Sequence, residues 1–429
     1  MTLGTRGTAW VPETRLYSDG VVIGDDGGPL VVPPRSGLQR IAGTGYLDRT
    51  SGALSGAAVP ARRELDAARD SLAAADLPGR GSIYAGMAEQ ALIDIDVLTF
   101  PNGAAVAAGS PYWRYVWPRD AGYMACALTV AGRPDTAFDL LSYVASMQEH
   151  DGTWQARYLP DGSGHVPDDR GLQLDGIGWT LWATWIWAST PAADPHVLGP
   201  MIGATVGAIL DALDPDTALP RVSQDFWEMD LDEATLGSAA PLLLGLRTGG
   251  DLLVRLGDSE LAGRAADAAR RMADAVATSF GGHGYARRLS GDGGRDASVA
   301  FLLPPFAPAD VCVERAWREA VEATTVDNGG VRPGEEWSDL ITAWTPQVSL
   351  HAMTAASIGD PALAHRLLSW LDVRRTSLGA LPEKVTADGR PAAVAPLGIT
   401  GATVLIALAS LEGRPLPLPP TDTHVTTPA

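Results

Sequence analysis

The chain of 429 residues has only two cysteines, Cys126 and Cys312, and seven histidines. Two isolated cysteines can build neither a disulfide framework nor a metal site. Each lies in an apolar, predicted helical stretch, so we expect two buried free thiols. The histidines show no metal-ligand spacing, and the chain lacks a Gly-Lys-Ser/Thr phosphate loop and a Gly-x-Ser-x-Gly elbow. The sequence therefore carries no signal for a metal centre, a nucleotide-phosphate loop or a serine nucleophile.

Basic residues are also scarce, with 32 Lys and Arg against 51 Asp and Glu and a net charge of −19. This balance argues against nucleic-acid and anionic-membrane partners, which need basic patches. It disfavours a strongly acidic substrate too, unless a local basic pocket overrides the mean, so a neutral ligand fits best. No apolar run has transmembrane length and the N-terminus lacks a signal-peptide core, so we expect a soluble, cytoplasmic protein. The sequence does not indicate its oligomeric state.

Strand signals are confined to the first part of the chain. Residues 1–81 combine dense Gly and Pro with short β-prone runs, which predicts a short β-rich N-terminal region ending in a helical piece. From residue 82 the hydrophobic pattern predicts helices, with a possible further helix within 325–342. The predicted helices cover 82–97, 119–131, 134–149, 174–189, 195–213, 234–256, 259–279, 308–323, 346–358, 361–373 and 399–412.

So many helices of similar length favour an all-α toroid of paired inner and outer helices. Loops at one end of such a barrel carry the chemistry, because structureless loops of unusual length are normally functional. The long predicted loops are 98–118, 150–173, 214–233, 280–307 and 374–398.

Three clusters between residues 111 and 228 place aromatic rings beside charged or amide groups: PYWRYVWPRD, DGTWQARYLPDG and SQDFWE. A sugar ring needs this combination, because it presents an apolar C–H face for stacking and a rim of hydroxyls for hydrogen bonds. A further acidic motif, LPEKV, lies at 381–385. Two glutamates together with tryptophans suit the cleavage of a glycosidic bond.

In the same order, the segments FPNGAAVAAGSPYWRYVWPRDAGYMACAL, DGTWQARYLPDG, LQLDGIGWTLWA, SQDFWE and GALPEKV resemble glycoside hydrolase family 15, the glucoamylase-like inverting α-glucosidases. The resemblance covers about residues 85–412. It implies an (α/α)6 barrel, release of glucose from the non-reducing end of a small carbohydrate substrate, and no metal or organic cofactor. We therefore expect a β-rich region at 1–81, a catalytic barrel at 82–415 and a Pro-rich tail at 416–429.

The resemblance assigns Glu228 as the general acid, which must be kept neutral by partial burial or a nearby negative charge. Trp227 could supply the apolar wall and Asp225 the charge. Glu383 would be the general base, and inversion requires a water between base and sugar, hence a carboxyl separation of ~6.5–9.5 Å. The plainer alternatives are a solvated carboxylate at a helix start and a loop salt bridge with Lys384.

Arg119 and Asp120, in WPRD, match the family's clamp on the terminal glucose, because paired polar groups reject an epimer strongly. An ordinary ion pair at a helix start is the alternative. Weaker candidates for lining the pocket are Trp113, Trp117, Trp154, Arg157, Gln173 and Asp175.

Other aromatic residues have simpler interpretations. Trp154 follows Gly152 in a loop and is the better stacking candidate, whereas the tryptophans between 179 and 187 have the spacing of a helix core face. The group Glu335, Glu336 and Trp337 could equally reach the pocket rim or form an exposed charged turn.

Three departures from the family pattern predict altered specificity, with starch not the natural substrate. Trp113 stands where the family has a tyrosine that helps hold the attacking water, and Met229 replaces an acidic residue after the general acid. Gly398-Ile399-Thr400 replaces a Trp-Ser pair. Two alternatives follow. One is a degenerate carbohydrate-binding barrel, if Trp113 blocks the water. The other is another α-toroid sugar enzyme, such as an epimerase or lyase, whose working His or Tyr motif is not evident.

Overall fold

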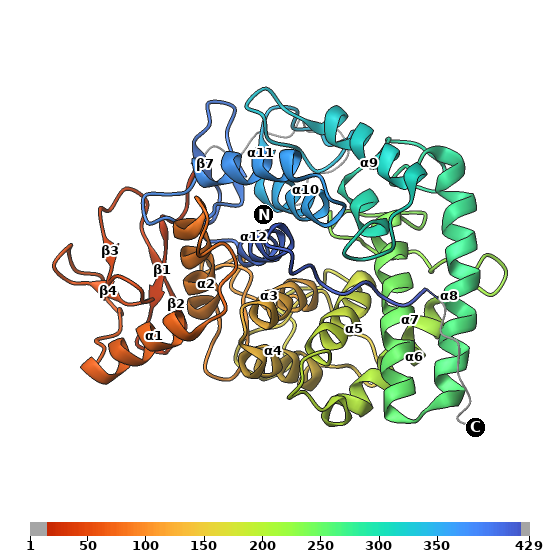
Figure 1. The fold of residues 1–429 in the computed structure, drawn as a ribbon, viewed down its shortest axis with the longest axis horizontal. Coiled ribbons are helices and arrows are strands. Elements are labelled where there is room, and N and C mark those ends of the chain that lie inside the picture. Colours follow the sequence, from red (N-terminus) through yellow and green to blue (C-terminus); the bar gives the residue numbers. More distant parts are fainter. Residues whose placement is uncertain (1–14, 422–429) are drawn as a thin grey trace.

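The computed structural model describes residues 15–421 (Figure 1). Its first part holds two antiparallel strand pairs and one helix. Val22, Val32 and Leu47 from these strands form a small apolar core that Leu378 closes from far along the chain. The elements are β1 (Gly20–Ile23) with β2 (Pro29–Val32), β3 (Gln39–Arg40) with β4 (Leu47–Asp48), and helix α1 (Arg62–Ala74).

The helices that follow begin and end within four residues of the predicted ranges. Local chemistry explains several starts. Proline occupies the first turn of α3, α4, α10 and α11, where its missing N–H costs nothing. Asp258, Asp310 and Asp360 cap α8, α9 and α11 by accepting backbone N–H groups. The helices are α2 (Ala85–Leu98), α3 (Pro118–Val130), α4 (Pro134–Ser146), α5 (Asp175–Trp187), α6 (Gly199–Ala212), α7 (Leu236–Leu256), α8 (Ser259–Ser279), α9 (Val311–Thr324), α10 (Thr345–Ser357), α11 (Pro361–Asp372) and α12 (Gly398–Leu411).

Helix contacts run in a closed ring through α3, α5, α7, the 3-10 segment η3 (Ala297–Leu302), α10, α12 and back to α3. A second layer packs outside: α4 on α3, α6 and α8 on α7, α9 on η3, α11 on α10 and α2 on α12. Burial follows this division, since every residue of α5 is buried whereas α8 and α9 bury one face only. The described residues thus form a helical toroid (Figure 1).

The sixth inner element differs from the prediction. No helix forms within 325–342, and η3 takes the inner position from inside the predicted loop 280–307. Pro304 and Pro305 follow one residue after η3 and cannot continue a helix. The 325–342 stretch packs closely instead: a Cβ on Gly330 would lie 2.4 Å from the Trp370 ring and 2.5 Å from Ala343. A helix there would need side chains that this space does not admit.

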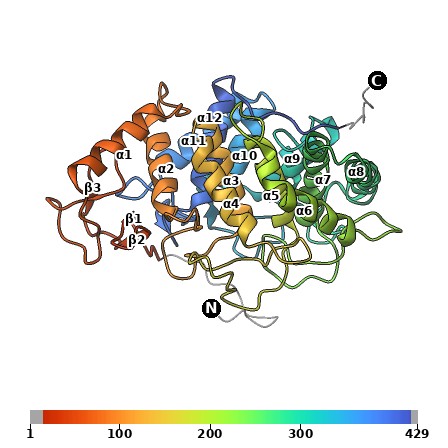
Figure 2. The same cartoon turned by 90° about the horizontal axis from the view of Figure 1, so that it is seen from below.

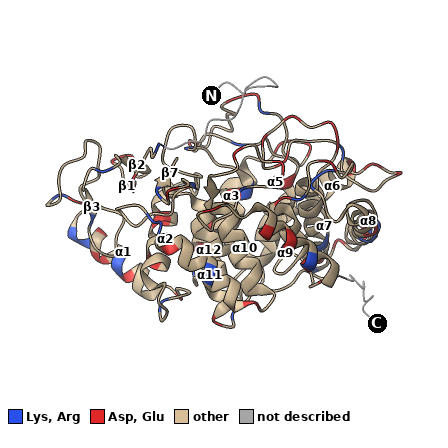
Figure 3. Cartoon of the chain, turned by 90° about the horizontal axis from the view of Figure 1, so that it is seen from above, with Lys and Arg blue, Asp and Glu red and all other residues tan. Residues whose placement is uncertain are grey.

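Loops gather at one end of the helices, as the two side views show (Figures 2 and 3). A small antiparallel sheet of β5 (Ala343–Trp344), β6 (Lys384–Val385) and β7 (Pro391–Ala392) joins two of these loops. None of the helices among residues 15–421 combines the length and apolar character needed to span a bilayer.

The start of the described chain pairs with a segment near its end. The Ser18 hydroxyl donates to the Ala395 carbonyl at 2.7 Å and accepts its N–H at 3.0 Å, across 377 residues. Ser377 donates to Asp19 at 2.8 Å. The N-terminal strands are therefore attached to the stretch 376–397, which carries Glu383.

Two predictions about the ends and the cysteines need comment. Cys126 is buried, and burial raises the pKa of its thiol, but Cys312 is exposed in the first turn of α9, so that prediction was wrong. The proposed boundaries at residues 81 and 415 stay predictions, and residues 1–14 and 422–429 lie outside the described part.

The closest helix crossing depends on a glycine and gives a first testable prediction. A Cβ on Gly178 in α5 would lie 1.9 Å from the Pro241 carbonyl oxygen in α7. We expect Gly178→Ala to destabilise the fold by about 1–3 kcal/mol, because the two helices must separate. Gly203→Ala in α6 is the control, since its Cβ meets no atom and alanine favours helix. Urea unfolding measures both, and equal effects would refute the packing argument.

Candidate active site

Glu228 lies at the end of a tight turn that begins at Asp225. One Asp225 carboxylate oxygen accepts the Trp227 N–H at 3.0 Å, and the Asp225 carbonyl accepts the Glu228 N–H at 2.9 Å. Glu228 has φ of 55°, in the left-handed region that residues other than glycine rarely adopt. Such strain persists where the surroundings hold it and often marks a functional position.

The Glu228 carboxylate is surrounded by N–H donors. Its Oε1 accepts Trp117 Nε1 at 3.0 Å and Gln173 Nε2 at 3.2 Å. Its Oε2 forms an ion pair with the Arg170 guanidinium. Trp117 and Gln173 are buried, whereas the Glu228 side chain keeps 25% of its surface exposed. The carboxylate is thus fixed on one side and open on the other.

Arg287 anchors the turn from beneath. Its Nη2 donates to both Asp225 oxygens, at 2.9 and 2.8 Å, and its guanidinium carbon lies 4.0 Å from the centre of a Trp227 ring. Both charged side chains are fully buried. Asp296, 3.6 Å from Arg287, is also buried, and burial raises its pKa to about 6 although the nearby guanidinium opposes the shift. This buried ion cluster holds Trp227, and with it Glu228, in place.

The predicted clamp residues lie in the first turn of α3. Arg119 Nη1 donates to Asp175 at 3.0 Å and to Gln173 at 3.3 Å, and Arg119 Nε lies 3.5 Å from Asp120. Burial raises the pKa of Asp120, Arg119 opposes the rise, and the negative charges of Asp175 and Glu383 add to it. Two buried carboxylates, Asp120 of α3 and Asp175 at the start of α5, therefore share one guanidinium, with Glu383 within electrostatic reach.

Glu383 lies immediately before β6 and is almost fully buried. Its N–H donates to the Val394 carbonyl at 2.8 Å, and its carbonyl accepts the N–H of Thr345, the first residue of α10, at 3.0 Å. Both contacts fix the backbone at this position. Glu228 contacts Trp117 and Glu383 acts electrostatically on Asp120, so both glutamates lie near the start of α3.

A row of aromatic rings connects the segments that carry the two glutamates. Trp227 meets Trp337 edge to face at 4.9 Å between ring centres, and Trp337 meets Trp344 in the same way at 5.3 Å. The Lys384 ammonium, from the only lysine of the chain, lies 4.1 Å from the Trp344 ring centre. The row begins one residue before Glu228 and ends one residue after Glu383.

The other predicted pocket residues divide into two groups. Arg157 lies 4.4 Å from the Tyr115 ring centre and 5.1 Å from that of Trp117, so it joins the Glu228 surroundings. Trp113 packs against the small apolar cluster of Ala108, Val394 and Leu397, and the Val394 carbonyl accepts the Glu383 N–H.

Trp154 does not belong with this group. It is fully buried in the main core, and its indole N–H donates to the Val144 carbonyl at 2.8 Å. A ring enclosed on all sides cannot stack on a sugar, so the stacking prediction for Trp154 fails in this structure.

Sequence reasoning missed Arg170, Asp168 and Arg287. Each contacts a predicted residue that lies at least 11 positions away in the sequence, and none belongs to a recognisable motif. Glu336, left open between rim and exposed turn, pairs with Arg287 at 3.0 Å and so belongs to the support of the site.

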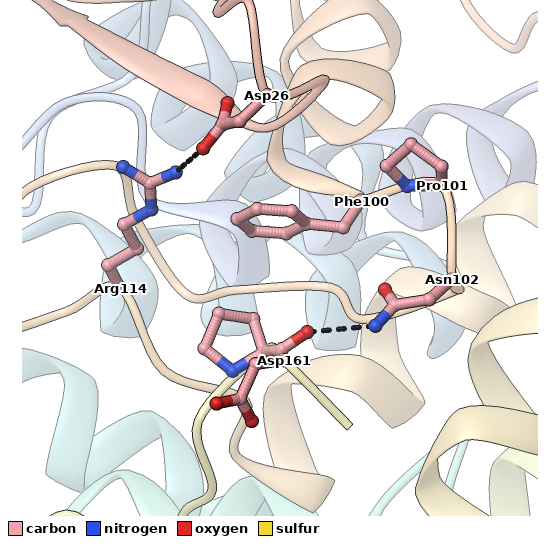
Figure 4. A pocket seen from close by; sticks show the side chains of 7 residues that line it. Asp26, Phe100, Pro101, Asn102, Arg114 and Asp161 are labelled. Atoms are coloured by element: carbon pink, nitrogen blue, oxygen red, sulfur yellow. Dashed lines mark hydrogen bonds and ion pairs between the residues drawn. The ribbon is translucent and has the colours of Figure 1, made fainter. Parts of the chain in front are cut away.

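A separate hollow of about 490 Å³ lies where the turn at Asp26 meets two loops (Figure 4). Arg114 pairs with Asp26 at 2.8 Å and lies 5.2 Å from the Phe100 ring centre, and Asn102 donates to the Pro160 carbonyl. The Phe100 ring is thus partly covered, and the hollow contains none of the residues around Glu228 and Glu383. The carboxylate cluster is the better candidate site.

No protein-family model matches the chain. An uncharacterized glycosyl hydrolase of Methanocaldococcus jannaschii is 32% identical over 110 residues, which is 25% of this chain and 17% of that protein. The match thus spans about a sixth of the relative.

Solved structures resemble the chain over most of its length. A glycosidase solved in complex with glucose superposes with a TM-score of 0.66 at 22% identity, covering 77% of this chain and 96% of that one. A bacterial glucoamylase complexed with acarbose gives 0.66 at 16%, covering 83% and 59%. The glucoamylase of Saccharomycopsis fibuligera gives 0.65 at 11%, covering 79% and 97%. The chain therefore has the helical fold of glucoamylase-like glycoside hydrolases.

Proposed function

We propose that this protein is a glycoside hydrolase of family 15 with an (α/α)6 barrel, and that it is an inverting exo-α-glucosidase. Glu228 is the general acid and Glu383 the general base. The observation that carries the proposal is that both glutamates interact with residues at the start of α3, Glu228 with Trp117 and Glu383 with Asp120, where Arg119 and Asp120 provide polar groups for one sugar. The ring of six inner elements and the glucoamylase-like fold support it.

Each residue has a task that its surroundings suit. Asp120 accepts from glucose hydroxyls, and Arg119, itself paired with Asp175, fixes its orientation. Glu228 delivers the proton of its carboxyl group; because Oε1 is held by two buried donors, Oε2 is the oxygen that carries this proton to the bond to be broken. Glu383 removes a proton from the water that attacks the opposite face of the sugar.

Proton NMR of the released sugar tests the function directly. An α-glucoside cleaved with inversion yields β-glucose first, before mutarotation equilibrates the anomers. Initial α-glucose would contradict the mechanism. Failure to release glucose from maltose, isomaltose, trehalose, kojibiose and nigerose would favour a carbohydrate-binding barrel instead.

Asp120→Asn is expected to raise KM and also to lower kcat. Its hydrogen bonds should tighten as the ring flattens towards the oxocarbenium-like transition state, so the loss falls on both constants. Asp135→Asn, which also changes an aspartate in the first turn of a helix, here α4, is a control. Steady-state kinetics decide, and unchanged constants for Asp120→Asn would assign the residue to a structural ion pair.

The remaining departures bear on substrate length. Met229 is 44% exposed beside Glu228, where an apolar side chain offers no hydrogen bond to an outer sugar. Gly398-Ile399-Thr400 begins α12, and the Thr400 hydroxyl is buried against the Thr345 hydroxyl at 3.0 Å. Met229 is therefore the departure whose side chain is exposed to a bound outer sugar.

We expect kcat/KM to change little with maltooligosaccharide length, because each outer sugar loses a contact of about 1–3 kcal/mol. Kinetics on a ladder from maltose to maltoheptaose measure this. The variant Met229→Glu should make the dependence steeper. A steep rise for the unmodified protein would identify an ordinary starch-degrading glucoamylase.

A further inference from the structure

Arg170 contacts the oxygen of Glu228 from which the proposed general acid must donate its proton. Glu228 Oε1 already accepts the buried Trp117 and Gln173 donors, so Oε2 is the oxygen that carries the proton towards the leaving group. In this structure Oε2 pairs with Arg170. Because all three partners are N–H donors, Glu228 is held here as a carboxylate, which has no proton to give.

Arg170 is the partner that can move. It lies in the loop between Tyr158 and Gln173, and its side chain is 32% exposed, whereas Trp117 and Gln173 are almost fully buried. A leaving group that approaches Oε2 therefore meets the Arg170 guanidinium first. The guanidinium either withdraws or binds that leaving group.

The charges around Glu228 favour the second possibility, in which the Arg170 guanidinium binds the leaving group. Arg157 and Arg170 share a single carboxylate, Asp168, with Arg170 Nε at 3.0 Å from it. With ionised Glu228 included, two positive and two negative groups balance. Once Glu228 is protonated for catalysis, the set carries one net positive charge. Arg157 is buried against two aromatic rings and bonded to Asp168, so the uncompensated charge lies at Arg170.

The neighbouring carboxylates pair with other cations and not with Arg170. Asp225 is engaged by the buried Arg287, and Asp120 and Asp175 by Arg119. Within residues 15–421 the ion pairs of Arg170 are with Asp168 and Glu228. A local cationic position thus exists beside the leaving group, despite the net charge of −19.

We infer that Arg170 binds an anionic group, a carboxylate or phosphate, on the leaving group, and that the substrates are α-glucosides of small acids. This inference rests on the proposed function of Glu228. Transfer of the guanidinium from Glu228 to the substrate anion also removes the positive charge that holds Glu228 ionised. Binding of the anion therefore favours the protonated, active form of the acid.

Two substrates made from one disaccharide test this. The neutral reducing disaccharide that the enzyme cleaves best is oxidised to its aldonate or reduced to its alditol, so the leaving groups differ only in a carboxylate or a hydroxymethyl group. We expect kcat/KM to be roughly tenfold higher for the aldonate, equivalent to about 1.4 kcal/mol. A second pair, α-glucosylglycerol and its glycerol phosphate ester, distinguishes phosphate from carboxylate.

Variants assign the preference to Arg170. Arg170→Gln should lower kcat/KM for the aldonate about tenfold, which brings the aldonate-to-alditol ratio of kcat/KM close to one. Arg170→Lys should keep part of this preference for the aldonate. Arg414→Gln is the matched control, because Arg414 also bridges two carboxylates at similar exposure but does so after α12. It should keep the full ratio.

The outcomes separate the two proposals. If neither substrate releases glucose, the proposed function is wrong. If both are cleaved with inversion but the aldonate-to-alditol ratio is one or less, the function stands and the role of Arg170 is overturned. That role is also overturned if Arg170→Gln retains the ratio of the unmodified protein.

Discussion

Glu228→Gln and Glu383→Gln should each lower kcat on a disaccharide by roughly 10²–10⁴-fold. Glutamine keeps the size of the side chain and can neither donate an acidic proton nor accept one from water. The fold should survive, because glutamine can still accept the Trp117 and Gln173 hydrogen bonds at position 228. Steady-state kinetics with an unfolding curve for each variant provide the measurement.

A second substrate distinguishes the two roles. α-Glucosyl fluoride has a leaving group that needs little protonation, so Glu228→Gln should retain most of its activity on it. Glu383→Gln should remain inactive, because the attacking water still lacks a base. Glu322→Gln, on the exposed face of α9, is the control and should match the unmodified protein. An unchanged kcat on the disaccharide in either site variant would contradict the assignment of that glutamate.

Arg287→Ala should destabilise the protein by about 3–5 kcal/mol, because it leaves the buried carboxylates of Asp225 and Asp296 without their cation. It should also lower activity by releasing the turn that positions Glu228. Arg270→Ala, which breaks an exposed pair on α8, should change stability by less than about 1 kcal/mol. Urea unfolding at pH 7 compares the two, and similar costs would contradict the role of the buried cluster.

The pH dependence of this variant has a definite sign. Burial already raises the pKa of Asp296 to about 6 with Arg287 present, and removing the guanidinium raises it further. A carboxyl whose folded pKa exceeds its unfolded value stabilises the fold at low pH, and this contribution is lost as pH rises through the folded pKa. The stability gap between Arg287→Ala and the unmodified protein should therefore widen from pH 5 to pH 8. The double variant Arg287→Ala, Asp225→Asn should show a smaller loss of stability than Arg287→Ala alone, because one buried carboxylate is removed.

Local signals predicted the helices well because they act within a few residues. Pro118, Pro134 and Pro361 begin helices where the sequence indicated, and the tryptophans of α5 lie in the core as their spacing required. The same reasoning failed at 325–342 and for Cys312. There the outcome depends on packing partners that lie far away in the chain.

The candidate site shows the same limit. Aromatic and acidic clusters indicated Glu228, Trp117 and Gln173, and the structure brings these three into contact. Arg170 and Arg287 were not predictable, because a lone arginine has no motif and its partner is decided by the fold. Trp154 shows the reverse case: a loop position suggested exposure, but its indole found a carbonyl partner inside the core.

The attachment of Ser18 to Ala395 also has a consequence for how the protein is made. A protein chain emerges from the ribosome N-terminus first, so Ser18 cannot bond to Ala395 until the segment around residue 395 has emerged. The ring of inner helices likewise closes only when α12 reaches α3. Contacts between segments so distant in sequence form slowly and leave apolar surface exposed in the meantime. We therefore expect Glu383 to reach its place late in folding, and a chain that ends before residue 383 would contain the proposed general acid without the proposed general base.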